Sequence, residues 1–407
     1  MRRREFITGA AALASYASLG QAGAVGIGRL GRQFGRLGSP LGGLKPQFSS
    51  GLTRTNTSNV RAAWAAKASN VLLATIGDST MAGVTTGAGT TQAVNSWPAK
   101  LATLLQAAGI NSGQNNRYGV ASGTFSFLTG FDSRVSATGG WSQGATLAVG
   151  GNAFACSATG ALSFTPQGNV TKFIIKWRDG AAGRNFNYQV DGGSTTAVNS
   201  SGTTQVASTG PISAGTSGSH TLTINWVLGS VTILGIDAYD DTSGRIEATI
   251  ENWGISGATS ANLIDNTDTQ AGRFVEYGVF APKLSLIESG VINDWEQSIS
   301  VATFQANMTT LVQKMLTVGD VIVCTPPFDP SSLGLAANQQ AYIDAMYAVA
   351  AANGCGVFDI RKKWGSYANA VANGWQAAGG TDPHPTQAGY LDYATAIMPT
   401  IRYALGV

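Results

Sequence analysis

The feature that most constrains the fold is a change of hydrophobic pattern that occurs twice along the chain. From about residue 70, apolar strand-like runs are followed by stretches with helical periodicity. From about residue 136 to residue 241, short runs alternate apolar and polar residues between turns such as Asp191-Gly192-Gly193. The first pattern is typical of an α/β domain and the second of a β-sandwich. The sequence therefore predicts an α/β domain over 65–135 and 246–407, interrupted by an inserted β-sandwich over 136–245.

The α/β part has a regular order of expected elements. They are a strand at 71–76, a helix from Ser96 to Gly109, strands at 246–250, 283–288, 320–325 and 356–360, and helical stretches at 259–277, 301–316, 336–352 and 388–405. Such an alternation indicates a mostly parallel sheet covered by helices on both faces. Catalytic groups of such sheets gather at the carboxyl ends of the strands. Candidate residues should therefore follow strands directly.

The N-terminal residues read as an export signal rather than as part of the fold. Arg3-Arg4-Glu5-Phe6-Ile7 resembles a twin-arginine signal, and a mildly apolar run follows. Ala22-Gly23-Ala24 supplies a small-x-small cleavage site. We expect a signal peptide at 1–24 and a linker at 25–64, and hence export to the periplasm or the cell exterior. A basic tail that stays attached is the alternative. The apolar run is too short for a stable membrane span.

Charge and cysteine usage exclude several classes of function. Charged residues make up 12% of the chain and the net charge is +3, with no basic stripe that would indicate a nucleic-acid partner. The three cysteines lie far apart, and buried thiols are favoured over a disulfide. Cysteine and histidine residues show no metal-ligand spacing, so no metal or other cofactor is expected.

The chain has only two histidines, which narrows the choice of a catalytic base. Ser79 directly follows the strand at 71–76, and a serine nucleophile needs a base with a pKa near neutrality. His384 lies after the last strand and before the last helix, two residues beyond Asp382. A nucleophile, a base and an acid that orients the base are the requirements of nucleophilic hydrolysis. His220 lies within the sandwich and is interpreted as a structural or surface residue.

Two further loops offer hydrogen-bond donors for a developing oxyanion. The run Glu251 to Thr259 follows a strand, and its Gly257 can bring a bare backbone N–H close to a nucleophile. Asn293 follows the strand at 283–288 and offers a side-chain amide. With the loops of Ser79 and His384, four loops at strand ends carry polar groups suited to acyl transfer.

In this order, Gly77-Asp78-Ser79, Asn252 to Thr259, Asn293-Asp294 and Asp382 to His384 resemble the four motif blocks of the SGNH (GDSL-type) hydrolases. The resemblance covers residues 65–135 and 245–407. It implies a flavodoxin-like three-layer α/β/α fold and ester hydrolysis through an acyl-enzyme. It implies Ser79 as nucleophile, His384 as base and Asp382 as its orienting acid, with an oxyanion hole of the Ser79 and Gly257 N–H groups and the Asn293 side chain.

The chain departs from the family pattern at two positions. The family acid normally stands three residues before the histidine, where this chain has Thr381, so a backbone carbonyl, Asp329 or Asp359 could orient His384 instead of Asp382. The third block normally has glycine two residues before its asparagine, where Val291 stands.

The inserted sandwich loosely resembles carbohydrate-binding modules of SGNH carbohydrate esterases, through 188–193 and 218–224. Its aromatic residues Trp177, Tyr188, Trp226 and Tyr239 could stack on sugars, although each is more typical of a strand core. The favoured function is an exported O-deacetylase whose substrate is an acylated glycan or a small ester. The alternatives are a lipase or thioesterase for longer acyl chains, and a non-catalytic glycan-binding surface protein.

Overall fold

The computed structural model of the chain describes residues 46–85, 93–122, 125–180, 183–288, 291–330, 339–379 and 382–407. These residues belong to one unit, Lys45–Val407. The predicted signal peptide, the first part of the predicted linker, and Thr381 lie outside the described residues.

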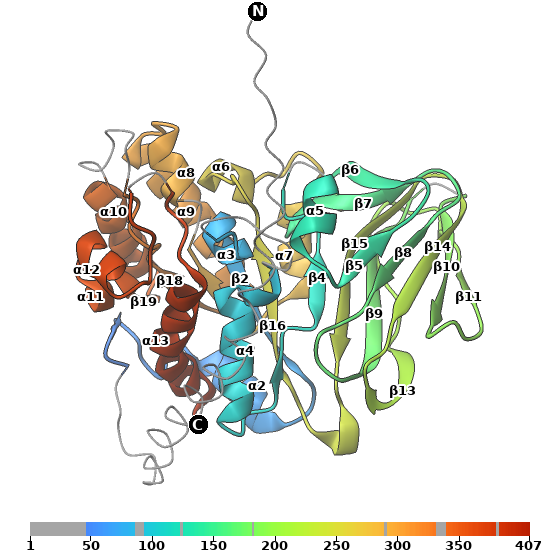
Figure 1. Cartoon of the computed structure of the whole chain (residues 1–407), viewed down its shortest axis with the longest axis horizontal. Coiled ribbons are helices and arrows are strands. Elements are labelled where there is room, and N and C mark those ends of the chain that lie inside the picture. Colours follow the sequence, from blue (N-terminus) through green and yellow to red (C-terminus); the bar gives the residue numbers. More distant parts are fainter. Residues whose placement is uncertain are drawn as a thin grey trace, which may run out of the picture. The chain divides into compact units, whose positions relative to one another are not determined.

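A seven-stranded sheet forms the centre of the α/β part (Figure 1). Its strand order is β1 (Ser49–Ser50), β19 (Gly356–Phe358), β18 (Asp320–Cys324), β17 (Leu284–Ile287), β2 (Val71–Gly77), β16 (Ala248–Gly254) and β3 (Ser112–Gly113). All neighbours pair in parallel except β1, which is antiparallel to β19. Successive side chains of these strands are buried on opposite faces, which is why the strands read as continuous apolar runs.

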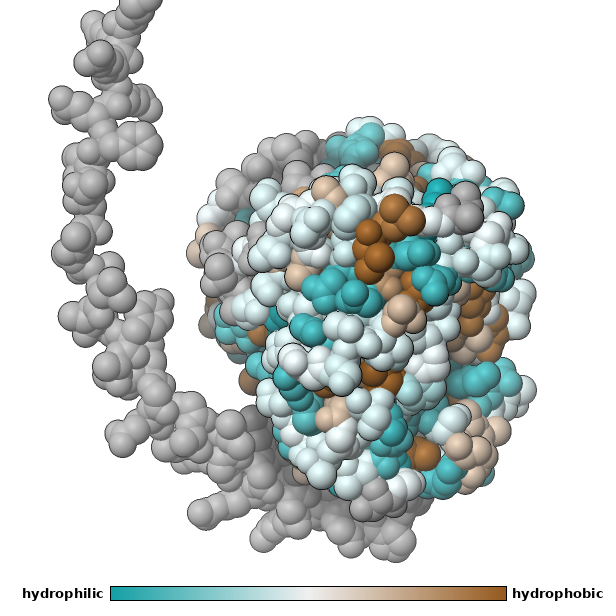
Figure 2. All heavy atoms as spheres, turned by 90° about the vertical axis from the view of Figure 1, so that its right-hand side faces the viewer, coloured by the Kyte–Doolittle hydropathy of each residue, from teal (hydrophilic) through white to brown (hydrophobic). Residues whose placement is uncertain are grey.

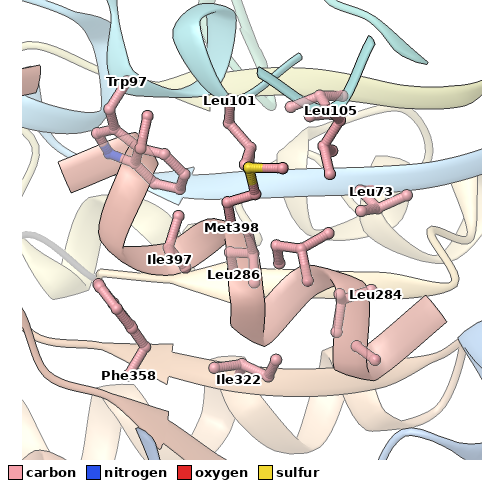
Figure 3. Close-up of a cluster of buried hydrophobic side chains, with 14 of the residues drawn as sticks. Leu73, Trp97, Leu101, Leu105, Leu284, Leu286, Ile322, Phe358, Ile397 and Met398 are labelled. Carbon is pink, nitrogen blue, oxygen red and sulfur yellow. The ribbon is translucent and has the colours of Figure 1, made fainter. Parts of the chain in front are cut away.

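Helices cover both faces of this sheet. The helices of the α/β part are α2 (Ser58–Ala66), α3 (Ser79–Ala82), α4 (Trp97–Ala107), α6 (Ser260–Leu263), α7 (Arg273–Phe280), α8 (Val291–Glu296), α9 (Val301–Leu316), α10 (Gln339–Ala352), α11 (Ile360–Trp364), α12 (Tyr367–Ala372) and α13 (Gln387–Leu405). One core cluster joins α2, α4 and α13 to the sheet, and Figure 3 shows part of it, from Leu101 and Ile397 to Leu73. A second cluster joins α7, α9 and α10 to the other face. The result is the predicted three-layer α/β/α arrangement.

The inserted sandwich consists of two antiparallel sheets with a shared core. One has the order β11 (Thr196–Val198), β10 (Asn185–Val190), β14 (Leu222–Leu228), β8 (Ala161–Phe164), β5 (Val135–Ala137). The other has the order β12 (Val206–Ser208), β9 (Val170–Arg178), β15 (Val231–Tyr239), β7 (Gly151–Cys156), β6 (Trp141–Ala148), with β13 (Ile212–Gly218) on β9 and β4 (Asn116–Tyr118) on β15. Phe164 and Leu222 from the first sheet pack in one cluster with Phe173 and Ile233 from the second.

The prediction of one continuous helix over 259–277 is wrong, because its middle part is not helical. Helix α6 ends at Leu263, and α7 begins only at Arg273. Between them, the Asp265 carboxylate accepts the Thr267 N–H, and the Asp268 carboxylate accepts the N–H groups of Gln270 and Ala271. Aspartate side chains that bind nearby N–H groups favour turns over helix, which explains the break.

The predicted linker contains ordered structure in its described portion. Strand β1 lies inside the predicted linker, and helix α2 begins inside it and ends two residues beyond it. Val60 and Trp64 of α2 are buried in the core cluster that contains α4 and α13. The Asp320 carboxylate fixes the start of α2 by accepting the Val60 N–H at 2.8 Å. Tertiary contacts, rather than local periodicity, therefore define this segment.

The three cysteines are free and buried, as the sequence predicts. Figure 2 shows the face of the inserted sandwich as mostly pale and teal, with apolar residues in small separate groups. In the described part of the chain, no helix is long and apolar enough to cross a membrane.

Candidate active site

Ser79 lies on a tight turn between β2 and α3. Asp78 caps the short helix α3, because its side chain accepts the Thr80 N–H. A side chain at Gly77 would stand 3.0 Å from the Met81 Cβ atom and 3.2 Å from the Glu288 Cβ atom, so this close approach favours glycine there. The N–H groups of Gly83 and Val84 both donate to the Ser79 carbonyl. This geometry leaves the Ser79 side chain at the carboxyl end of a central strand, where the sequence analysis expected it.

His384 contacts Ser79 across 305 residues of sequence. Its Nε2 atom lies 2.8 Å from the Ser79 Oγ atom, and its Nδ1 atom lies 2.5 Å from the Asp382 Oδ1 atom. The same Asp382 oxygen accepts the backbone N–H of His384 at 2.9 Å. These hydrogen bonds, with the side-chain bond from His384 as the largest cause, lower the pKa of Asp382. The carboxylate is therefore held in its ionised form against the imidazole.

The loop of His384 is fixed on both sides. Thr386 caps α13 by accepting the Gly389 N–H, and its own N–H donates to the Trp375 carbonyl at 3.0 Å. Gln376 and Pro385 form an isolated antiparallel bridge. The imidazole therefore projects from a braced loop rather than from a free surface turn.

The other acids considered for His384 are engaged elsewhere. Asp359 accepts hydrogen bonds from Thr325 Oγ1 at 2.8 Å and from the Tyr347 hydroxyl at 2.6 Å. Asp329 accepts the Trp295 indole N–H at 2.6 Å. Asp382, two residues before His384, is the acid that the fold brings to Nδ1.

Gly257 and Asn293 lie together beside the Ser79 turn. Gly257 has φ +78° with open space where a side chain would be, and its N–H has no hydrogen-bond partner among the described residues. The Asn293 amide donates to the Ala258 carbonyl at 2.8 Å. Within the described chain, no hydrogen bond joins either residue directly to Ser79.

The strand before Gly257 holds this loop close to the Ser79 turn. The Ile255 N–H donates to the Gly77 carbonyl at 3.0 Å, and the Asn252 amide donates to the Met81 carbonyl at 3.0 Å. A side chain at Gly254 would stand 2.2 Å from the Ala82 nitrogen, so only glycine permits this approach. These contacts give Asn252 and Gly254 a positioning role that the sequence analysis did not assign.

Asp294 also went unassigned at the sequence level. Its carboxylate accepts the N–H and the hydroxyl of Ser260, at 2.6 and 2.7 Å. Burial raises the pKa of Asp294 to about 6, and the Ser260 bonds oppose the shift. Asn293 and Asp294 thus hold both ends of the segment Ala258–Ser260, just after Gly257.

The aromatic residues of the inserted sandwich mostly serve its core. Trp177 is buried and packs edge-on against Phe186, with ring centroids 5.6 Å apart. Trp226 is half-buried and donates its indole N–H to the Gly229 carbonyl at 2.6 Å. Tyr188 packs against the same cluster, and Tyr239 is half-buried. Within the described residues, no group of three or more His, Cys, Asp or Glu side chains could hold a metal ion.

Comparison with known proteins agrees with this geometry. Residues 238–391 match the model of the GDSL-like Lipase/Acylhydrolase family. The match begins near the end of the inserted sandwich and so does not include Ser79. Strand β2, which precedes Ser79, pairs in parallel with β16 of the matched part. No curated protein matches the chain.

Among solved structures, the chain is similar to a peptidoglycan O-acetylesterase, with 16% identity over 88% of this chain and 99% of that one and a TM-score of 0.66. A family two carbohydrate esterase from Cellvibrio japonicus has 12% identity, coverage of 72% and 98%, and a TM-score of 0.30. A lipase/acylhydrolase from Enterococcus faecalis has 24% identity, coverage of 39% and 77%, and a TM-score of 0.32. Only the first of these scores supports a shared fold.

Fold, family match and strand-end serine define the class of protein as a serine ester hydrolase. Residues 238–391 resemble the GDSL-like acylhydrolases, and the structure adds a β-rich domain inserted in the α/β fold.

Proposed function

We propose that the protein is an exported esterase that removes O-acyl groups, above all O-acetyl groups, from a carbohydrate. Ser79 is the nucleophile, His384 the base and Asp382 the acid that orients the base. The observation that carries this proposal is the continuous chain from Asp382 Oδ1 through the imidazole to Ser79 Oγ, with contacts of 2.5 and 2.8 Å. Such a chain matches the requirements of nucleophilic acyl transfer.

The reaction proceeds in two balanced halves. Ser79 Oγ attacks the ester carbonyl carbon while its proton passes to His384 Nε2, and the negative charge goes to the carbonyl oxygen. Collapse of this intermediate expels the sugar oxygen, which takes the proton from His384 and leaves an acyl-serine. Water then attacks the acyl-serine with His384 again as base, which releases the carboxylic acid and restores Ser79.

The oxyanion is bound by the N–H groups of Ser79 and Gly257 and by the side chain of Asn293. The Ser79 N–H lies at the start of α3, and the Gly257 N–H has no partner among the described residues, so both can donate to a substrate oxygen. Asn293 uses one amide hydrogen for the Ala258 carbonyl, and an amide has a second hydrogen for the substrate.

The position of the inserted sandwich supports a carbohydrate as the acyl carrier. A cavity of about 290 Å³ lies between the sandwich and the segment that joins α6 to α7, lined among others by Leu147, Arg178 and Asp268. The Arg178 guanidinium donates to Asp268 through Nε at 3.0 Å and has further N–H groups available for hydroxyl or carboxylate oxygens. The solved structure that matches 88% of this chain with a TM-score of 0.66 is a peptidoglycan O-acetylesterase, which favours a cell-wall glycan.

The test compares acyl chains and carriers on wild type and Ser79→Ala. Release of p-nitrophenol is measured from acetate and octanoate esters, and release of acetate from acetylated peptidoglycan and acetylated xylan. We expect Ser79-dependent turnover of acetate esters and of at least one acetylated glycan. Equal rates for wild type and Ser79→Ala on all four substrates would disprove the esterase proposal, and a preference for octanoate would favour a lipase or thioesterase.

Export is tested separately by localisation. We expect the full chain to reach the periplasm or the medium, and the double change Arg3→Lys and Arg4→Lys to retain it in the cytoplasm. Export of this double variant at the wild-type level would contradict the twin-arginine route.

A further inference from the structure

Two carboxyl groups share one hydroxyl directly behind the nucleophile turn. The Asp78 Oδ1 atom accepts the N–H of Thr80 at 2.9 Å and lies 2.8 Å from the Thr80 hydroxyl. The same hydroxyl is hydrogen-bonded to the Glu288 Oε1 atom, at the end of β17. All three residues are buried, with at most 1% of each exposed.

Counting hydrogens shows that this arrangement contains an extra proton. A threonine hydroxyl donates one hydrogen and accepts others, whereas an ionised carboxylate can only accept. If the Thr80 hydrogen binds Asp78, the Thr80 oxygen must accept a hydrogen from Glu288. If the Thr80 hydrogen binds Glu288, the oxygen must accept a hydrogen from Asp78. At least one of the two acids is therefore protonated in the folded enzyme.

The surroundings assign this proton to Glu288. Asp78 accepts the backbone N–H and the hydroxyl of Thr80, and these contacts oppose the rise in its pKa that burial causes. Glu288 faces Asp78, the Cys324 thiol and the phenols of Tyr390 and Tyr393, none of which is a cation. Only the Thr80 hydroxyl and the Trp97 indole oppose the rise in its pKa. Burial, followed by the charge of Asp78, raises the pKa of Glu288 well above its usual value.

We propose that Glu288 is a positioning residue that stays protonated while the enzyme works and donates its proton to Thr80, whose own hydrogen then binds Asp78. This inference rests on the proposed role of Ser79. The relay Glu288–Thr80–Asp78 fixes the cap of α3 and hence the position of the Ser79 N–H and Oγ groups. It also leaves one negative charge behind the serine instead of two, which limits repulsion of the developing oxyanion.

The first test compares two replacements of Glu288. Glutamine keeps a donor for the Thr80 oxygen without a charge, so we expect kcat and KM of Glu288→Gln within about threefold of wild type at pH 7. Leucine removes the donor, so we expect Glu288→Leu to lose about tenfold or more in kcat with KM little changed, as for loss of one buried hydrogen bond. A Glu288→Gln variant that unfolds at the wild-type temperature but loses more than about thirtyfold in kcat would overturn the proposal.

A second pair of variants covers the case in which Glu288 variants do not fold. Thr80→Ser retains the relay hydroxyl and should keep kcat near that of wild type. Thr80→Val removes it and should lower kcat by about tenfold, with a smaller effect on KM. Equal kcat values for the two variants would overturn the positioning role.

The protonation state is measured without reference to activity. The infrared spectrum of wild type minus Glu288→Gln at pH 7 should contain the carbonyl band of a protonated carboxylic acid. Glu276→Gln is the matched control, because Glu276 is also a buried acid but lies on α7, where it accepts the Val149 N–H. Burial also raises the pKa of Glu276, to about 8, so its difference spectrum should contain a separate acid band, and the Glu288 band should cancel from it. A carboxylate band for Glu288 would disprove the proposal even if Ser79 proves to be the nucleophile, so the two claims fail separately.

Discussion

The two histidines of this chain make nearly the same pair with aspartate but in two different regions. In the α/β part, His384 Nδ1 lies 2.5 Å from Asp382, and in the inserted sandwich, His220 Nδ1 lies 2.6 Å from Asp191. The difference is at Nε2. His384 faces the Ser79 hydroxyl at 2.8 Å, whereas His220 faces the Thr216 carbonyl at 2.8 Å.

This difference decides the charge and the use of each ring. The Thr216 carbonyl can only accept, and so can the Asp191 carboxylate, so both His220 nitrogens must donate and the ring is held as a cation. These contacts, the Asp191 bond first, raise the pKa of His220. The Ser79 hydroxyl can donate, so the Nε2 atom of His384 can accept a hydrogen bond from it. An aspartate–histidine pair can therefore act as a base only where Nε2, the nitrogen that does not contact the aspartate, faces a hydrogen-bond donor.

The two histidines should differ most when each is replaced by alanine and kcat is measured. We expect His384→Ala and Ser79→Ala to lower kcat for p-nitrophenyl acetate by about four powers of ten or more, because each removes a member of the proton-transfer chain. His220→Ala, the matched control, should retain the wild-type kcat. A large loss of kcat in folded His220→Ala would remove the distinction between the two sites.

The aspartates should show the next largest difference. We expect Asp382→Asn to lower kcat by about two to four powers of ten, because an amide cannot stabilise the imidazolium that forms during acyl transfer. Asp191→Asn should leave kcat unchanged and affect only the local turn. If Asp382→Asn retains full kcat, another group orients His384 and our choice among the acids is wrong.

The oxyanion site should give a smaller but distinct effect. Removal of one donor costs about two to three powers of ten in kcat, so we expect that range for Asn293→Ala. Asn225→Ala is a suitable control, because Asn225 also donates through its amide, to Asn187 in the sandwich. A loss for Asn293→Ala that appears wholly in KM would place Asn293 in ground-state binding instead.

The smallest effect concerns stability and pH. Because the folded-state pKa of His220 is raised, its contribution is complete below the unfolded value near 6.5 and is lost as pH rises through the folded value. The pair is partly exposed, so we expect at most about 1 kcal/mol. Thermal unfolding of wild type and His220→Gln should differ more at pH 5.5 than at pH 8.5. A larger difference at pH 8.5 would contradict the cationic assignment.

Much of the fold and site could be predicted because the signals are local. Strand β2 and helix α9 follow from clear hydrophobic periods, and Ser79 and His384 follow from the rule that polar groups gather after parallel strands. Asp382 was in doubt from its spacing alone. Its backbone and side-chain bonds to His384 show that a two-residue separation still closes the contact.

The remainder depends on contacts between distant segments. Glu288 looks like an ordinary charge at the end of an apolar strand, and only the parallel pairing of β17 with β2 brings it beneath Thr80. Helix α2 lies beyond a Gly-rich stretch and is defined by contacts with β18 and α13 rather than by its own period. The hydrophobic periodicity of a sequence does not show which distant segments pack together.

The central claim is that Ser79, activated by His384, attacks the ester. A p-nitrophenyl phosphonate reacts with such a serine to give a stable adduct, which peptide mass spectrometry can locate. We predict the adduct on Ser79 in wild type and in His220→Ala at similar rates, and strongly slowed labelling in His384→Ala. Labelling at another residue, or equal rates in His384→Ala and His220→Ala, would contradict the account.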